Sequence, residues 1–224
     1  MDYTSDYAEI YDILRSYIDH KLEIDKLDSF ISEIGINKNE CNILSVGCGT
    51  GFHELLLAKK DFSIVGIDLS ENMIERAKNK NNFKNIDFIA TSLEEFNSSQ
   101  KFSFAYSLGN VINCLPKLSD LISFFKHLNK FLIPSSKIYI EFWNSIPCII
   151  DPPKKVTRNY VDENQKFNLE RIATPTNNLI NQEVIINYQI TGENNGKIIN
   201  AHSTHKLTLF TILELEYALE LNGF

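Results

Sequence analysis

Three glycines at alternating positions follow a short apolar run, and they constrain the fold more than any other feature of this chain. Residues 42–53 read NILSVGCGTGFH, and a second apolar run at 64–67 leads directly into Asp68. Glycine adopts left-handed backbone angles and lets the chain approach a ligand without a Cβ in the way. The order strand, glycine turn, helix, strand and carboxylate builds a nucleoside pocket at the carboxyl end of a parallel sheet. The sequence therefore predicts an α/β fold with a ligand site at this turn.

The spacing of Gly47, Gly49 and Gly51 narrows the type of ligand. The dinucleotide fingerprint is Gly-x-Gly-x-x-Gly, whereas Phe52 stands here in place of its third glycine. No Gly-Lys-Ser/Thr is present, which argues against a P-loop. Asp68 lies about 20 residues past the first glycine, where a ribose-binding acid is expected. A merely tight turn is the alternative reading, but such a turn would not need three glycines.

Composition and charge restrict the class of protein. The chain has 224 residues, 43% of them hydrophobic, and a formal net charge of −7. This charge argues against a nucleic-acid partner, which requires a basic surface. The four cysteines form no Cys-x-x-Cys pair, so we expect reduced thiols in a cytoplasmic protein and no metal site. No signal segment opens the chain and no apolar run reaches the roughly 20 residues of a membrane span, so we expect no membrane partner.

Apolar periodicity predicts the order of the elements. Residues 3–34 carry apolar side chains at helical spacing, which predicts an N-terminal helical cap within residues 1–40. The strands and helices that follow alternate, and this predicts a doubly wound, mostly parallel sheet. The expected strands are 43–46, 63–67, 86–90, 102–107 and 137–142, and the expected helices are 52–59, 71–80 and 118–131.

The pattern changes after Trp143. A loop is expected at 147–153, and β-rich segments then cover 167–173, 179–191 and 197–211 with turn signals between them. We interpret residues 147–211 as a three-stranded antiparallel insertion after strand 5 that covers the substrate pocket. A last helix is expected at 214–221, and residues 1–224 are treated as a single domain.

Two motifs resemble the class I S-adenosylmethionine-dependent methyltransferases. They are Val-Gly-Cys-Gly-Thr-Gly at 46–51 and Gly-Ile-Asp-Leu-Ser-x-x-Met-Ile-x-x-Ala at 66–77. The resemblance implies a Rossmann-like methyltransferase fold and S-adenosylmethionine as the cofactor. It also implies that a helix ending in Gly-Phe precedes two further strands, so at Phe224 we expect either a longer native protein or a sheet that lacks an edge.

The resemblance implies a role for each matching position. The three glycines would hold the methionine part and the ribose, Asp68 would accept both ribose hydroxyls, and Leu69 and Met73 would flank the adenine. Ser92 and Leu93 match positions that meet the adenine edge. The implied cofactor-binding residues are Gly47, Cys48, Gly49, Gly51, Asp68, Leu69, Met73, Ser92, Leu93, Ser107 and Tyr11.

Two positions depart from the family. In place of Ser45, relatives usually carry an acid, and that acid holds the cofactor's ammonium group. In place of Ser92 they often carry a second acid, which contacts the adenine amino group. Serine accepts a hydrogen bond but carries no charge, and a charge-assisted bond is roughly twice as strong as a neutral one. We therefore expect weaker cofactor binding than in relatives, or compensation from elsewhere.

Three further segments favour a small-molecule acceptor. Residues 7–12 resemble small-molecule N-methyltransferases, residues 107–115 resemble the loop after strand 4 in glycine N-methyltransferases, and residues 202–211 resemble the insertion of enzymes that N-methylate amino sugars on nucleotide carriers. The resemblance therefore implies methylation of an amine. A methyltransferase acting on RNA or protein, and a catalytically inactive cofactor-binding module, are the alternatives, and a homodimer is left open.

Three residues are the candidate catalytic groups: Tyr11, Asn110 and His205. Tyr11 and Tyr7 lie four residues apart on a predicted helix, where an aromatic face suits the sulfonium, although packing on the sheet explains them equally well. Asn110 and Asn113 follow the fourth strand at the ligand edge, with loop capping as the alternative. His205 would be the general base, because histidine titrates near neutral pH, with an ordinary surface or core histidine as the alternative.

Overall fold

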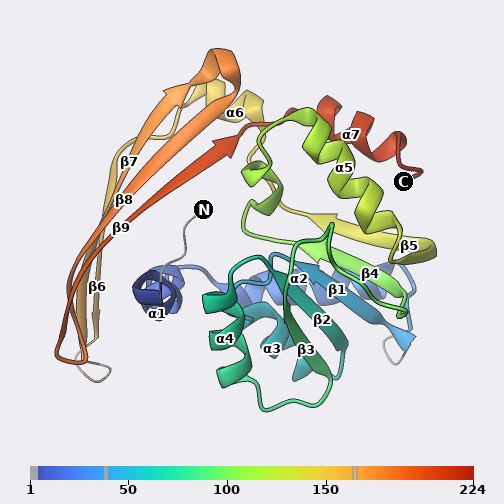
Figure 1. Ribbon diagram of the computed structural model, residues 1–224, viewed down its shortest axis with the longest axis horizontal. Helices are drawn as coiled ribbons and strands as arrows, with labels where there is room; N and C mark the ends of the chain where they lie inside the picture. The colour runs from blue at the N-terminus through green and yellow to red at the C-terminus, as the bar shows by residue number, and fades with distance from the viewer. Residues whose placement is uncertain (1–4, 38–39, 163, 165) are drawn as a thin grey trace.

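A five-stranded parallel sheet forms the centre of the protein (Figure 1), whose computed structural model describes residues 5–37, 40–162, 164 and 166–224. Neighbouring strands pair in parallel in the order β3-β2-β1-β4-β5. Chain order reverses between β1 and β4, and the carboxyl ends at such a reversal form the crevice in which open α/β sheets bind ligands. The strands are β1 (Asn42–Val46), β2 (Ser63–Asp68), β3 (Ile86–Ala90), β4 (Phe102–Ser107) and β5 (Leu132–Ile140).

Helices pack on both faces of this sheet, which confirms the doubly wound prediction. Because successive strand residues face opposite sides, Ile43 packs into one core and its neighbour Leu44 into the other. The first core lies against α2 (His20–Glu33), α3 (Phe52–Ala58) and α4 (Glu71–Lys80). The second lies against α5 (Leu118–Asn129) and α7 (Ile212–Glu220), above the sheet in Figure 1.

The insertion after the fifth strand is an antiparallel sheet of four strands, not the three predicted. Its order is β6 (Val156–Asp162), β7 (Phe167–Asn178), β8 (Glu183–Asn194) and β9 (Lys197–Thr208), and it forms the long curved ribbon at the left of Figure 1. The sequence pattern missed β6 because this edge strand buries only Tyr160 and therefore shows no apolar alternation. That the insertion covers a substrate pocket stays a prediction.

Helix α1 (Ser5–Arg15) lies between the two sheets. Its residues Tyr7, Ile10 and Leu14 share one apolar core with Met73 of α4 and with residues of the four antiparallel strands. The predicted N-terminal helices are thus present as α1 and α2, while residues 1–4 and 38–39 of the expected cap lie outside the described residues. This packing places α1 over the crevice of the parallel sheet.

Smaller differences from the predicted boundaries have local causes. Strand β5 begins five residues early, and its pairing with β4 shifts between Phe102 and Phe104. Part of the expected loop is helix α6 (Ser145–Ile150), whose first turn is capped by the Asn144 side chain accepting from the Ile146 N–H. The 3₁₀ segments η2 (Val111–Cys114) and η3 (Leu179–Asn181) follow β4 and β7.

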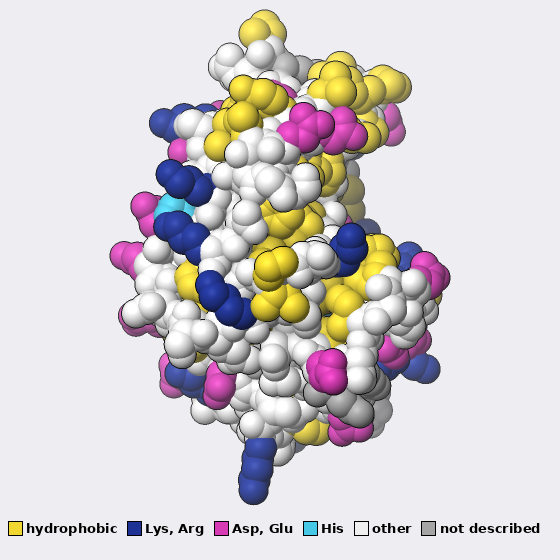
Figure 2. Space-filling model, turned by 90° about the vertical axis from the view of Figure 1, so that its right-hand side faces the viewer, with side chains coloured by type: hydrophobic (Ala, Val, Ile, Leu, Met, Phe, Trp, Pro, Cys, Tyr) yellow, Lys and Arg dark blue, Asp and Glu magenta, His cyan; other side chains and the backbone are white. Residues whose placement is uncertain are grey.

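The β5 side of the molecule carries exposed apolar side chains. Figure 2 looks at this side and shows hydrophobic groups gathered among charged residues. The exposed apolar side chains of α7 and β5 include Leu213, Tyr217 and Ile133. Within the described ranges, no helix combines the length and the apolar character needed to cross a membrane.

Candidate functional site

The glycine turn joins β1 to α3 with left-handed backbone angles at all three glycines. The φ angles are 78° at Gly47, 56° at Gly49 and 75° at Gly51. A Cβ on Gly51 would lie 2.5 Å from the Phe88 ring, and one on Gly47 would lie 2.4 Å from a Val111 methyl. The turn therefore needs glycine for its backbone angles and for its close packing.

Asp68 stands at the end of β2 and faces this turn. Its Oδ2 accepts from the Gly49 N–H at 2.8 Å and its Oδ1 accepts from the Ser70 N–H at 2.9 Å. Burial raises the pKa of Asp68 above its usual value, and the two backbone hydrogen bonds act against that rise. An ionised carboxylate has about four acceptor positions, so about two remain for a ligand.

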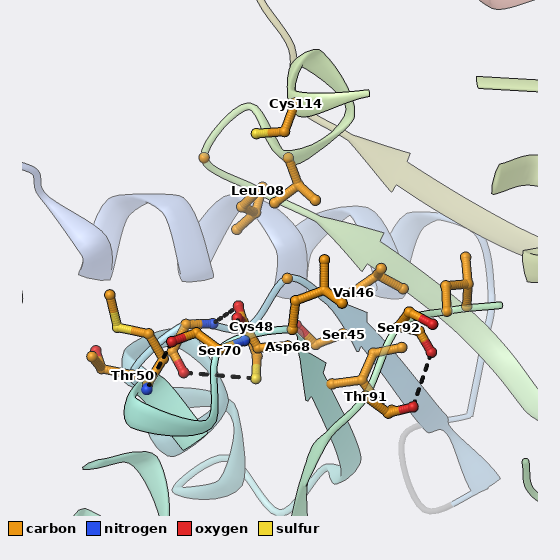
Figure 3. A pocket seen from close by; sticks show the side chains of 18 of the residues that line it. Ser45, Val46, Cys48, Thr50, Asp68, Ser70, Thr91, Ser92, Leu108 and Cys114 are labelled. Atoms are coloured by element: carbon orange, nitrogen blue, oxygen red, sulfur yellow. Dashed lines mark hydrogen bonds between the residues drawn. The ribbon is translucent and has the colours of Figure 1, made fainter. Parts of the chain in front are cut away.

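A cavity of about 760 Å³ opens at the carboxyl ends of β1, β2 and β4. Figure 3 shows Asp68, Cys48 and Ser70 gathered on one side of it, with Leu108 and Cys114 opposite. This volume lies within the range of about 300–1,000 Å³ that is common for small-molecule sites. Nine predicted cofactor residues line the cavity: Tyr11, Gly47, Cys48, Gly49, Asp68, Leu69, Met73, Ser92 and Leu93.

Two predicted cofactor residues do not line the cavity. Gly51 belongs to the turn but not to the cavity lining, and the Phe88 ring and the Ala77 side chain fill the space that its Cβ would take. Ser107 is buried, and its hydroxyl donates to the Val46 carbonyl at 2.8 Å. Both residues hold the wall in shape, and direct cofactor contact by either of them stays a prediction.

The predicted adenine-binding residues differ in their surroundings. The Leu69 side chain is 76% exposed, whereas Met73 is buried in the core around α1. The Ser92 hydroxyl accepts from the Glu95 N–H and donates to the Glu95 carboxylate, both at 3.0 Å. Since Ser92 has one hydroxyl hydrogen, this local pair occupies its donor and leaves acceptor capacity only.

Helix α1 carries Tyr11 over the glycine turn. A Cβ on Gly49 would lie 3.9 Å from the Tyr11 ring, and burial raises the pKa of Tyr11. Asp12 fixes this arrangement, because it accepts from Thr50 on the turn and from the Lys80 ammonium at 2.7 Å. The aromatic ring of Tyr11 is therefore part of the cavity wall.

The other catalytic candidates lie beside the cavity and not in its lining. His205 on β9 contacts the rings of Tyr188, at 4.8 Å between centroids, and Tyr7, at 6.0 Å. Tyr7 in turn lies 6.1 Å from Tyr11, so one row of rings connects His205 to the wall. Burial lowers the pKa of His205 to about 4, and the charges of Arg171 and Arg15 act in the same direction.

The two asparagines after β4 have different surroundings. Asn110 adopts φ 64° at the start of η2, and its buried Oδ1 has no hydrogen-bond partner within the described residues. Asn113 donates to the carbonyls of Trp143 and Thr208 and accepts from the Trp143 N–H. The Asn113 side chain thus links η2 to Trp143 and Thr208, which agrees with the interpretation of Asn113 as a loop-capping residue.

Sequence reasoning missed Glu54, a buried acid that also lines the cavity. Its Oε1 accepts from the Ser45 hydroxyl and from the Tyr106 phenol, both at 2.6 Å. A signal existed, because Glu54 is spaced three and four residues from Leu57 and Ala58, the other buried residues of α3. An acid on the apolar face of a helix beside the glycine turn is a candidate for contact with a ligand.

A second unpredicted group lies at the edge of the cavity. Glu23 contacts His20 at 3.0 Å and His53 at 2.8 Å, and the ligand atoms of the three residues lie within 4.8 Å of one another, as a metal site requires. Burial raises the pKa of Glu23, but hydrogen bonds from the two histidines outweigh it and hold that pKa well below its ordinary range. Both contacts are to the same carboxylate oxygen, Oε2, and the expected absence of a metal stays a prediction.

Comparisons with known proteins agree on one class of enzyme. The family model described as a methyltransferase domain matches residues 37–192. A malonyl-[acyl-carrier protein] O-methyltransferase from Ilyobacter polytropus is 30% identical over 61% of this chain and 53% of that protein. A dTDP-3-amino-3,6-dideoxy-alpha-D-glucopyranose N,N-dimethyltransferase from Streptomyces fradiae is 22% identical over 99% of this chain and 85% of that protein.

Solved structures show the same fold. The sugar N-methyltransferase KedS8 from Streptoalloteichus has a TM-score of 0.82 at 18% identity, with coverage of 95% of this chain and 83% of that one. The chain spans about half the length of the first curated relatives it matches, 53% and 55%.

Proposed function

This chain belongs to the methyltransferase domain family, and we propose that it methylates the amine of a small molecule, such as an amino sugar on a nucleotide carrier. The family's cofactor is S-adenosylmethionine. The observation that carries the proposal is the cavity in which the glycine turn and Asp68 lie together at the sheet's crevice, under the Tyr11 ring. This arrangement fits a nucleoside whose ribose hydroxyls donate to a carboxylate.

The residues present fit the cofactor at its ribose and adenine. Asp68 has acceptor positions left for two hydroxyls after its bonds to Gly49 and Ser70. The left-handed glycines allow the backbone to approach the ligand closely, and the exposed Leu69 side chain offers an apolar surface to the adenine. When bound, S-adenosylmethionine would supply an electrophilic methyl group on sulfur for transfer to the acceptor nitrogen.

Positioning of the acceptor explains more of the rate than a general base does. Holding two reactants in line supplies about 7–11 kcal/mol, whereas a positioned base contributes roughly 10²–10⁴-fold, or about 3–5 kcal/mol. In this proposal Tyr11, which lies in the cavity wall, confines the methyl group. Asn110 lies beside the cavity, and its buried Oδ1, which has no hydrogen-bond partner within the described residues, would accept from the acceptor amine. Because its pKa is about 4, His205 is neutral at neutral pH and is only a weak base. A weak base is sufficient when the acceptor amine enters the site already uncharged.

Three observations support a small-molecule acceptor, and the third of them bears on RNA alone. The relative that covers 99% of this chain is by its name an amino-sugar dimethyltransferase, and KedS8 is described as a sugar N-methyltransferase. The net charge of −7 opposes a phosphate backbone.

The test is formation of S-adenosylhomocysteine with a panel of acceptors. Amines and dTDP-linked amino sugars form one arm, and RNA, protein and acyl-carrier-protein substrates form the other. Turnover in the first arm, absent from an Asp68→Ala variant, supports the proposal. Turnover confined to the second arm would overturn the choice of acceptor, and cofactor binding without turnover in either arm would overturn the catalytic assignment.

A further inference from the structure

Glu54 presents a buried carboxylate oxygen at the wall of the cavity. The residue is 1% exposed and lines the cavity. Its Oε1 accepts two short hydrogen bonds, but its Oε2 is buried and has no hydrogen-bond partner among the residues that the structure describes. No ion pair in this part of the chain includes Glu54 either. A buried charge without a partner is costly, so a cation in the cavity would supply what this oxygen lacks.

The two donors to Glu54 are held in place by the register of the sheet. Ser45 on β1 and Tyr106 on β4 are register partners on the two central strands. Their hydroxyls therefore lie side by side, and both reach Oε1 at 2.6 Å. Because both donors bind the same oxygen, the carboxylate is fixed while its second oxygen keeps its acceptor capacity.

The Glu54 carboxylate compensates for the absence of an acid at Ser45. The resemblance to methyltransferases implies an acid at that strand position, and here the position holds an uncharged hydroxyl that donates to an acid nine residues later. The charge is thus present beside the end of β1, but it comes from the first turn of α3.

We propose that Glu54 is the binding residue for the ammonium group of S-adenosylmethionine, with its Oε2 accepting from that cation. The inference rests on the proposed function, because it needs S-adenosylmethionine in this cavity. Ser45 and Tyr106 are positioning residues, since they act on the ligand only through the Glu54 carboxylate.

The test compares two ligands that share the adenosine part. S-adenosylhomocysteine carries the ammonium group, whereas 5′-methylthioadenosine lacks the whole amino-acid part. Glu54→Gln keeps the shape of the side chain and an oxygen that accepts from Ser45 and Tyr106, but removes the charge. Calorimetric titration should show S-adenosylhomocysteine binding weakened about 10- to 100-fold, with 5′-methylthioadenosine binding changed less than about twofold.

Asp68→Asn is the matched control, because it removes a carboxylate charge at the ribose and should weaken both ligands together. Thermal unfolding monitors whether E54Q is folded, and if it is not, Tyr106→Phe takes its place. That variant removes one donor to Glu54 and should weaken S-adenosylhomocysteine several-fold while sparing 5′-methylthioadenosine.

The outcomes separate this inference from the proposed function. If Glu54→Gln or Tyr106→Phe weakens both ligands equally, or leaves binding of S-adenosylhomocysteine unchanged, the assignment of Glu54 is overturned while the cofactor site stands. If the wild-type protein binds neither ligand, both the proposed function and the inference drawn from it are wrong.

Discussion

Replacing Asp68 by Asn should weaken both ribose binding and the stability of the fold. The carboxylate accepts from the Gly49 and Ser70 N–H groups at 2.8 and 2.9 Å, and in our proposal also from two ribose hydroxyls. A hydrogen bond to a charged group contributes about 1.5–3 kcal/mol, and a neutral acceptor is about half as strong. Asn keeps one acceptor oxygen and no charge.

The expected loss follows from these values. One ribose bond is lost and the other is halved, so binding should weaken by about 2–4 kcal/mol, or roughly 30- to 1,000-fold in Kd. The amide NH₂ of Asn also cannot accept from a backbone N–H, and this should cost about 1–3 kcal/mol of folding stability. Calorimetric titration with S-adenosylhomocysteine measures the first quantity and chemical denaturation measures the second.

Asp87→Asn is the control, because it is the same substitution on the adjacent strand β3 at an exposed position away from the cavity. It should leave both quantities unchanged. If Asp68→Asn binds S-adenosylhomocysteine within about threefold of the wild-type protein, the reasoning that places the ribose on Asp68 is refuted.

Three further predictions concern stability. Gly51→Ala should destabilise the fold by about 2–5 kcal/mol in chemical denaturation, because left-handed backbone strain adds to a Cβ placed 2.5 Å from the Phe88 ring. Gly196→Ala, at φ 79° with open space around it, should cost only the strain of about 1–2 kcal/mol, and equal losses would contradict the packing argument. Because the pKa of His205 falls from 6.5 to about 4 on folding, the unfolded chain binds more protons between these values; stability is complete above pH 6.5 and should decline by about 3 kcal/mol as the pH approaches 4. Denaturation at several pH values should show that His205→Phe removes this part of the decline, and an unchanged pH profile would count against it. Thr211→Ala removes the capping box of α7 and should cost about 1 kcal/mol, read as a lower thermal midpoint, and no change would show that the cap is dispensable.

Local features of the sequence determined the parallel sheet and the position of the glycine turn beside Asp68. The glycine turn and Asp68 lie at the ends of two strands that pair directly, and the Gly49 N–H reaches Asp68 across 19 residues of one strand–helix–strand unit. Apolar alternation then located the strands with a buried face, and it failed for β6, whose residues are mostly exposed at the edge of its sheet.

Tertiary structure alone decided the surroundings of Glu54, His205 and Asn113. Glu54 meets Tyr106, 52 residues away, only because β1 and β4 pair in one register. Asn113 bonds to Thr208 across 95 residues, and His205 owes its low pKa to burial against α1 and β8. Apolar periodicity indicates which face of a helix or strand is buried, because the residues of one face recur at a fixed spacing along the chain. The partner of a buried polar group depends on which elements meet and in what register, and the sequence of one element does not contain that information.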